Sequence, residues 1–203
     1  MKKIDFENGT ITDNILSASI PMLVAQLLNL LYNVVDRIYI ARIPHIGTTA
    51  IGAVGICFPV IVIITAFANL FGSGGTPLFS IYRGRKKNKE AALIMDTSFS
   101  MLCAGAFIMS CGMLFSKPIL MLFGASDSTI VYAYPYMMIY LIGTIPSMLA
   151  LGLNPYINAQ GYSTTGMISV AIGAVLNFIL DPLFIFVFGL GVKGAAVATV
   201  ISQ

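Results

Sequence analysis

Charged residues are scarce in this sequence. They make up 9% of its 203 residues, whereas 58% are hydrophobic. A soluble domain carries roughly a quarter charged residues, so this class of protein is excluded. Several apolar runs reach the ~20 residues that a helix needs to cross a bilayer. The sequence therefore predicts an all-α membrane protein with several spans.

Histidine and cysteine are also scarce, with one histidine and three cysteines. All three cysteines fall inside apolar runs, and His45 has no carboxylate or thiol near it in the sequence. A disulfide framework and a zinc site are therefore not expected. An intramembrane protease or transferase would need a nucleophile with a base, or a metal, inside the membrane. No enzyme activity, cofactor or nucleic-acid partner is expected, and a purely structural subunit stays open as an alternative.

The apolar runs predict six helices, at about 14–41, 48–82, 89–115, 128–153, 164–188 and 194–203. The sixth has about ten residues where a span needs about twenty. The sequence is therefore expected to stop inside a membrane helix and to be part of something longer. Pro135 and Pro146 are expected to break the fourth helix.

The basic residues favour one orientation in the membrane. Seven of the eleven Lys and Arg residues lie at Lys2 and Lys3 or in the run 83–89. Because positive residues stay on the cytoplasmic side, we expect the N-terminus and the loop between the second and third helices in the cytoplasm. The run 83–89 is interpreted as a loop that sets topology, rather than as a lipid or nucleotide site.

The fifth helix contains an ionisable residue, Asp181, in an otherwise apolar segment. Placing such a side chain in hydrocarbon costs ~2.5 kcal/mol or more, so it marks a functional site by default. Asn177 precedes it by four residues and lies on the same face of the helix. Pro182 lacks a backbone donor and makes the helix prone to kink. Together these features suit a small cation or a proton.

The first helix has a polar stripe. Gln26, Asn29, Asn33 and Asp36 recur at spacings of three, four and three residues, which places them on one face. Such a stripe can simply join helices by hydrogen bonds. That role does not require a carboxylate, however, so Asp36 favours function. Arg37 points about 100° away and is expected to extend to the membrane surface.

Three polar residues on separate helices share one depth. At ~1.5 Å per residue, Asp36 lies roughly 8 Å, Asp181 roughly 10 Å and Thr199 roughly 8 Å below the outer ends of their helices. Two carboxylates at one level in a low dielectric cannot both stay ionised without help. A proton or a bound monovalent cation resolves the conflict, and this is the predicted basis of ion coupling.

Several motifs resemble the multidrug and toxic compound extrusion family. They are residues 31–40 (LYNVVDRIYI), the glycine-rich run 72–77, residues 177–182 (NFILDP) and residues 191–199 (GVKGAAVAT). The resemblance covers the whole chain but only the N-terminal half of the family's usual length. It implies that residues 1–203 form the N-terminal six-helix lobe of a twelve-helix transporter, with the C-terminal lobe absent.

The resemblance also implies a function and a site. Members export organic cations in exchange for protons or sodium ions by alternating access, and many hold the coupling ion in the N-terminal lobe. Asp36, Asn177, Asp181 and Thr199 match that site, and no metal other than Na⁺ is expected there. Pro21 matches a proline linked to bending of the first helix, and Pro182 offers a second bend.

The leading hypothesis is thus a multidrug efflux antiporter in the cell membrane, in keeping with a bacterial inner membrane. Its substrates are small organic cations, and its partners are membrane lipid and the absent lobe. The substrate cavity is expected to be lined by Gln26, Asn29, Asn33 and Asn154. The alternative is a flippase for lipid-linked oligosaccharides or lipids of the same broad superfamily. An anionic head group would call for Lys or Arg facing the cavity, whereas the middle of this membrane region is acidic.

Overall fold

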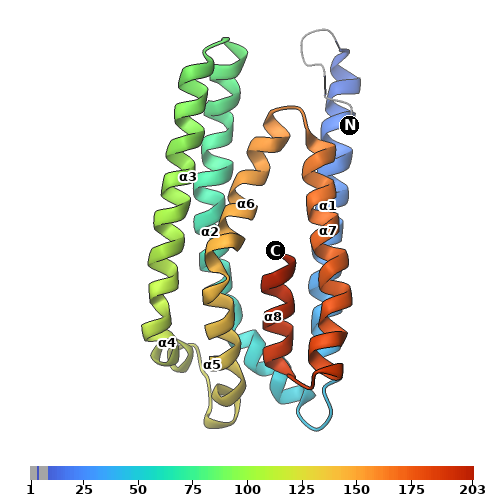
Figure 1. The fold of residues 1–203 in the computed structure, drawn as a ribbon, viewed down its shortest axis with the longest axis vertical. Helices are drawn as coiled ribbons and strands as arrows, with labels where there is room; N and C mark the ends of the chain where they lie inside the picture. The colour runs from blue at the N-terminus through green and yellow to red at the C-terminus, as the bar shows by residue number, and fades with distance from the viewer. Residues whose placement is uncertain (1–3, 5–8) are drawn as a thin grey trace.

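A computed structural model describes residue 4 and residues 9–203 of the chain. Every regular element in this part is helical (Figure 1). The main helices are α1 (Ile11–Ala41), α2 (Gly47–Gly84), α3 (Asn88–Cys111), α4 (Ser116–Leu122), α5 (Asp127–Ile142), α6 (Thr144–Ala159), α7 (Ser163–Pro182) and α8 (Val192–Ser202). A 3₁₀ turn at Gly112–Phe115 joins α3 to α4, and a π-helical turn at Leu183–Val187 continues α7.

The helices form two neighbouring groups. On one side α1 packs along α7, and on the other α2 packs against α3 (Figure 1). Between them α6 contacts α2, α3 and α7, while α8 contacts α5 and α7. Asp36 and Asp181 therefore lie on two helices, α1 and α7, that are far apart in the sequence but adjacent in space.

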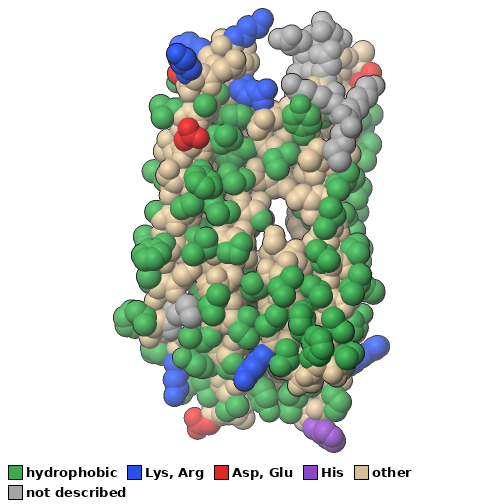
Figure 2. Space-filling view, viewed as in Figure 1, with side chains coloured by type: hydrophobic (Ala, Val, Ile, Leu, Met, Phe, Trp, Pro, Cys, Tyr) green, Lys and Arg blue, Asp and Glu red, His purple; other side chains and the backbone are tan. Residues whose placement is uncertain are grey.

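The lengths and composition of these helices fit a multi-pass membrane protein. Four segments are long and apolar enough to cross a membrane, namely α1, α2, α3 and the stretch Ser163–Val187. In those segments at most 22% of the most apolar window is buried inside the chain. Hydrophobic side chains cover the outer surface, and Lys and Arg gather towards the two ends (Figure 2). Such a surface is stable only against lipid or further protein.

The fourth expected span differs from the prediction. It consists of α5 and α6, which are bent by 58° relative to each other and reach Ala159 instead of residue 153. The break lies at Gly143, where Pro146 in the first turn of α6 offers no N–H to the carbonyl of Ile142. Pro135 does not break its helix, because α5 continues through it. A membrane helix tolerates the loss of one backbone hydrogen bond when neighbouring helices hold it.

The third expected span also ends earlier than predicted. The α-helix stops at Cys111 instead of residue 115, and the segment that follows is helical again over α4. Ser116 and Leu120 of α4 are buried, and α4 packs against α5. The short helix α4 has too few apolar residues to cross a membrane, so the search for spans left it outside the predicted helices.

The two groups of helices meet at a crossing of glycines. A Cβ atom added to Gly72 of α2 would lie within 3.0 Å of the backbone of Gly152 in α6. One turn further on, Gly75 leaves space for the Tyr156 hydroxyl, and a Cβ there would collide with it. Small residues at such positions let membrane helices approach closely. The glycine-rich run 72–77 therefore serves helix packing.

We predict that Gly72→Ala lowers stability by about 1–3 kcal/mol, because the methyl group must separate α2 from α6. The control is Gly74→Ala on the same helix, where an added Cβ meets no atom within 4 Å. Alanine at that position should be neutral or stabilising by about 0.5–1 kcal/mol. Thermal unfolding of the purified protein in detergent checks both; equal melting temperatures for the two variants would contradict the close crossing.

Candidate functional site

A pair of buried carboxylates lies where α1 packs against α7. Asp36 is in the second-last turn of α1 and is 8% exposed, and Asp181 is the penultimate residue of α7 and fully buried. The two carboxyl groups lie within hydrogen-bonding reach of each other and also interact through their charges. The sequence-based prediction that these two residues share one depth agrees with this contact.

Asn177 is the third member of the group. Its Nδ2 donates a hydrogen bond to Oδ1 of Asp181 over 3.3 Å, one helical turn away. The remaining oxygens lack donors: Oδ1 of Asp36, Oδ1 of Asn177 and Oδ2 of Asp181 are buried without a hydrogen-bond partner among the described residues. Leaving a buried acceptor unpaired costs about 1–3 kcal/mol. The site therefore has buried acceptors to spare.

Neither carboxylate forms an ion pair in the part of the chain that the structure describes, although the charge of Arg37 acts on Asp36. Arg37 is the nearest candidate in sequence, but its guanidinium lies over the ring of Phe58, 5.3 Å from the centroid. The one ion pair found among the described residues joins Lys87 to Glu90 at the other end of the molecule. The carboxylates are thus not part of a salt bridge, which favours a mobile cation as their partner.

Two tyrosines interact with the carboxylates and a third packs beside them, and the sequence analysis assigned none of the three to the site. Tyr32 precedes Asp36 by one turn and interacts with both carboxylates, and the buried Tyr136 interacts with Asp36. The ring of Tyr136 stacks on that of Tyr140, with centroids 6.4 Å apart. The side chain of Gln203 reaches the hydroxyls of Tyr32 and Tyr140. Spacings of four residues between Tyr32 and Asp36, and between Tyr136 and Tyr140, were the available signal.

Thr199 is buried on α8, which packs against α5 and α7. Its hydroxyl donates to the carbonyl of Ala195 over 2.9 Å, within its own helix. A hydroxyl oxygen that donates in this way keeps lone pairs free to accept or to coordinate. Its role at the ion site stays a prediction.

The polar stripe of α1 splits into a buried end and an exposed part. Asp36 is buried, whereas Gln26 and Asn33 are exposed and Asn29 is half-buried. Nδ2 of Asn33 donates to the carbonyl of Asn29 over 2.7 Å, inside the helix. The exposed residues are free to meet a substrate or further protein. Pro21 lies within α1, which continues through it as one helix.

Asn154 lies away from the carboxylates. Its Nδ2 donates to the carbonyl of Gly166 over 3.3 Å, and its Oδ1 accepts from Asn158 over 3.1 Å. Gly166 and Asp181 are fifteen residues apart on α7, or roughly 22 Å. Asn154 therefore joins α6 to the beginning of α7, near the opposite end of that helix from the carboxylates. The expectation that it shares a cavity with the α1 stripe gains no support from these contacts.

Comparisons with known proteins agree on one family. A family model described as MatE matches residues 21–183. The multidrug export protein MepA of Staphylococcus haemolyticus is 30% identical over 199 residues, which are 98% of this chain and 44% of MepA.

A solved structure of a MOP superfamily transporter from Pyrococcus furiosus matches 100% of this chain and 44% of its own, with 26% identity and a TM-score of 0.90. A MATE family multidrug resistance transporter in an outward-facing conformation gives 26% identity and a TM-score of 0.86, over 93% of this chain and 41% of its own. The chain thus spans less than half the length of these relatives.

We predict that Asn177→Leu lowers the free energy of unfolding by about 1–3 kcal/mol, because Asp181 then loses its amide donor while it stays buried. The double variant Asn177→Leu/Asp181→Leu should recover most of that loss, since replacing both polar partners by apolar groups is often neutral or stabilising. Chemical denaturation in detergent, followed by circular dichroism, measures both. A single variant as stable as the parent would show that the amide contributes nothing to the buried group.

Proposed function

The chain belongs to the MatE family, and we propose that it forms the N-terminal lobe of an antiporter that exports organic cations in exchange for protons or sodium ions. Its similarity to multidrug export proteins supports efflux as the direction of transport. The chain covers 44% of MepA, and the proposal assigns the rest of the transport path to a second lobe.

One observation carries the ion-coupling part of the proposal. Three buried oxygens on α1 and α7 lack donors, and two of them belong to carboxylates that repel each other. A proton on one carboxylate removes the repulsion and supplies a donor. A sodium ion does the same by coordination, because hard cations take oxygen ligands. We assign the ion to Asp36, Asn177 and Asp181, with Thr199 completing the set.

Ion occupancy would be linked to helix packing because the ligands lie on different helices. With the cation bound, α1 and α7 are attracted to a shared positive charge; without it, their carboxylates push them apart. An organic cation can neutralise the same carboxylates, so the ion and the substrate compete. Each changes the conformational populations only by its differential affinity for the two states. Pro21 and Pro182 are the proposed bend points.

The exposed part of the α1 stripe is the proposed substrate surface. Gln26, Asn29 and Asn33 continue from Asp36 along the helix, and their amides can orient a cation that the carboxylate attracts. We propose that this surface faces the second lobe, since an exposed amide is costly against lipid.

The proposed orientation has the N-terminus in the cytoplasm of a bacterial cell. The loop between α2 and α3 contains Arg85, Lys86 and Lys87, and it lies at the same end of the molecule as the N-terminal end of α1 (Figure 1). Positive residues that flank spans are retained on the cytoplasmic side. The carboxylate pair then lies in the outer half of the membrane.

The direct test is efflux of a fluorescent organic cation from vesicles that contain the intact transporter. Asp36→Asn and Asp181→Asn should each lower ion-driven efflux at least tenfold, because an amide can neither bind a proton nor hold a cation by charge. The matched control is Asp96→Asn, which changes an exposed acid on α3. It should leave efflux unchanged.

The same assay identifies the coupling ion. If efflux responds to an imposed proton gradient and not to a sodium gradient, the coupling ion is the proton. If efflux responds only to the sodium gradient, the coupling ion is Na⁺. Parental efflux rates in both aspartate variants would remove the mechanism, whichever gradient is applied.

A further inference from the structure

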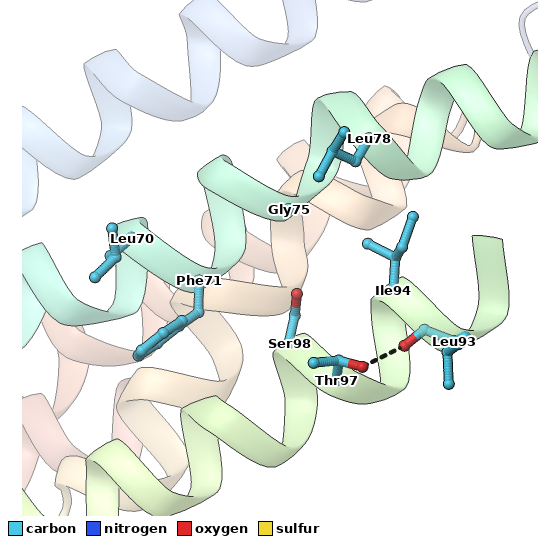
Figure 3. A pocket seen from close by; sticks show the side chains of 8 residues that line it. All are labelled: Leu70, Phe71, Gly75, Leu78, Leu93, Ile94, Thr97 and Ser98. Carbon is cyan, nitrogen blue, oxygen red and sulfur yellow. Dashed lines mark hydrogen bonds between the residues drawn. The ribbon is translucent and has the colours of Figure 1, made fainter. Parts of the chain in front are cut away.

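A groove on the outer surface lies between α2 and α3, in the half of the molecule that carries the basic loop. Its volume is about 350 Å³. Figure 3 shows the two helices that form its walls, with Phe71 of α2 and Ile94 and Ser98 of α3 extending into the space between them. The lining residues are Leu70, Phe71, Gly75, Leu78, Leu93, Ile94, Thr97 and Ser98.

The polar groups of this groove are already paired. Ser98 accepts a hydrogen bond from the Tyr156 hydroxyl over 2.6 Å at the floor, where Gly75 leaves room for the phenol. The Thr97 hydroxyl donates to the carbonyl of Leu93 over 2.7 Å (Figure 3). The groove therefore offers an occupant apolar contacts and no unmet hydrogen bond. Leu70, Leu78 and Leu93 are all more than half exposed, so the walls face outward.

Two basic residues, Arg85 and Lys86, lie at one end of the groove, which we call its mouth. The groove face of α2 includes Leu78, and Arg85 follows seven residues later on the same face, roughly 10 Å away. Lys86 comes next in the loop, and both side chains are exposed. Lys87 is paired with Glu90 at 3.8 Å, so the acid nearest the mouth is neutralised. Arg85 and Lys86 thus present unbalanced positive charge where the groove reaches the membrane surface.

The sequence alone favoured a topology-setting role for the run 83–89 over a lipid site, but the groove beside it changes that interpretation. We propose that the groove binds one acyl chain of an anionic phospholipid whose phosphate lies against Arg85 and Lys86. An apolar groove with paired polar groups suits the chain, and the charge at its mouth selects the head group. Basic residues at a membrane surface attract anionic lipid by about 1 kcal/mol each, so two of them favour it over a zwitterionic lipid by about 30-fold. Such a lipid bridges α2 and α3 next to the glycine crossing with α6, so it supports the lobe at its cytoplasmic end.

The test uses the absence of tryptophan from the sequence. Any tryptophan of the second lobe is first replaced by phenylalanine, so that a single tryptophan introduced into this lobe reports only on its own surroundings. Leu78→Trp places the probe in the groove, and Val62→Trp places a control on the same helix, roughly 24 Å away. The intact protein is reconstituted in phosphatidylcholine with an equal fraction of brominated phosphatidylglycerol or brominated phosphatidylcholine. Brominated phosphatidylglycerol should quench the fluorescence of Leu78→Trp several-fold more strongly than brominated phosphatidylcholine does. The two lipids should quench Val62→Trp equally.

The charges are tested in the Leu78→Trp background. Arg85→Gln/Lys86→Asn should abolish the preference, and asparagine suits the positive φ of 60° at residue 86. The control variant Lys117→Gln/Lys193→Gln removes two positive charges from the opposite end of the molecule. It should preserve the preference for brominated phosphatidylglycerol. Equal quenching by both lipids, or a preference that survives Arg85→Gln/Lys86→Asn, overturns the head-group assignment. No quenching by either lipid means that protein covers the groove, and this also overturns the proposal.

Discussion

Two carboxylates buried side by side, with fewer donors than acceptors, are the constraint on which the rest of this lobe depends. Asp36 and Asp181 come from helices α1 and α7, which pack along each other, and Asn177 offers one amide donor to the pair. Their unpaired oxygens would be a plain cost in a protein that only had to be stable. In a transporter the same deficit becomes useful, because a cation from solution can meet it and can be exchanged.

The remaining helices position this pair. The glycine crossing between Gly72 and Gly152 fixes α2 against α6 at backbone contact, so that side of the lobe is closely packed. At the other end of α7, Asn154 joins α6 to α7 through the carbonyl of Gly166. At the carboxylate end, the ring of Phe178 packs against Tyr39 of α1, and the helix passes into a π-helical turn directly after Pro182. A rigid end and an irregular end on one helix suit a change in packing near the ion site.

The sequence alone was sufficient for features that depend on local patterns. The apolar runs indicated the spans, the spacing of Asn177 and Asp181 placed them on one face, and depth counting brought Asp36 to their level. Features that depend on tertiary contacts could not be predicted. Pro135 and Pro146 look alike in sequence, yet only the second lies at a break, because the surrounding helices decide which lost hydrogen bond is tolerated. Tyr136 lies beside Asp36 through the packing of α5, which no local pattern in the sequence predicts. The groove between α2 and α3 likewise exists only once the two helices are side by side.

Calorimetry of organic-cation binding to the intact transporter tests the central claim most directly. The titration is carried out in two buffers of different ionisation enthalpy, each with and without sodium. If the carboxylate pair holds one exchangeable cation, the substrate must displace it. The binding heat will then depend on the buffer because protons are released, or the affinity will fall as sodium is added. Binding that is indifferent to both the buffer and sodium would contradict the account.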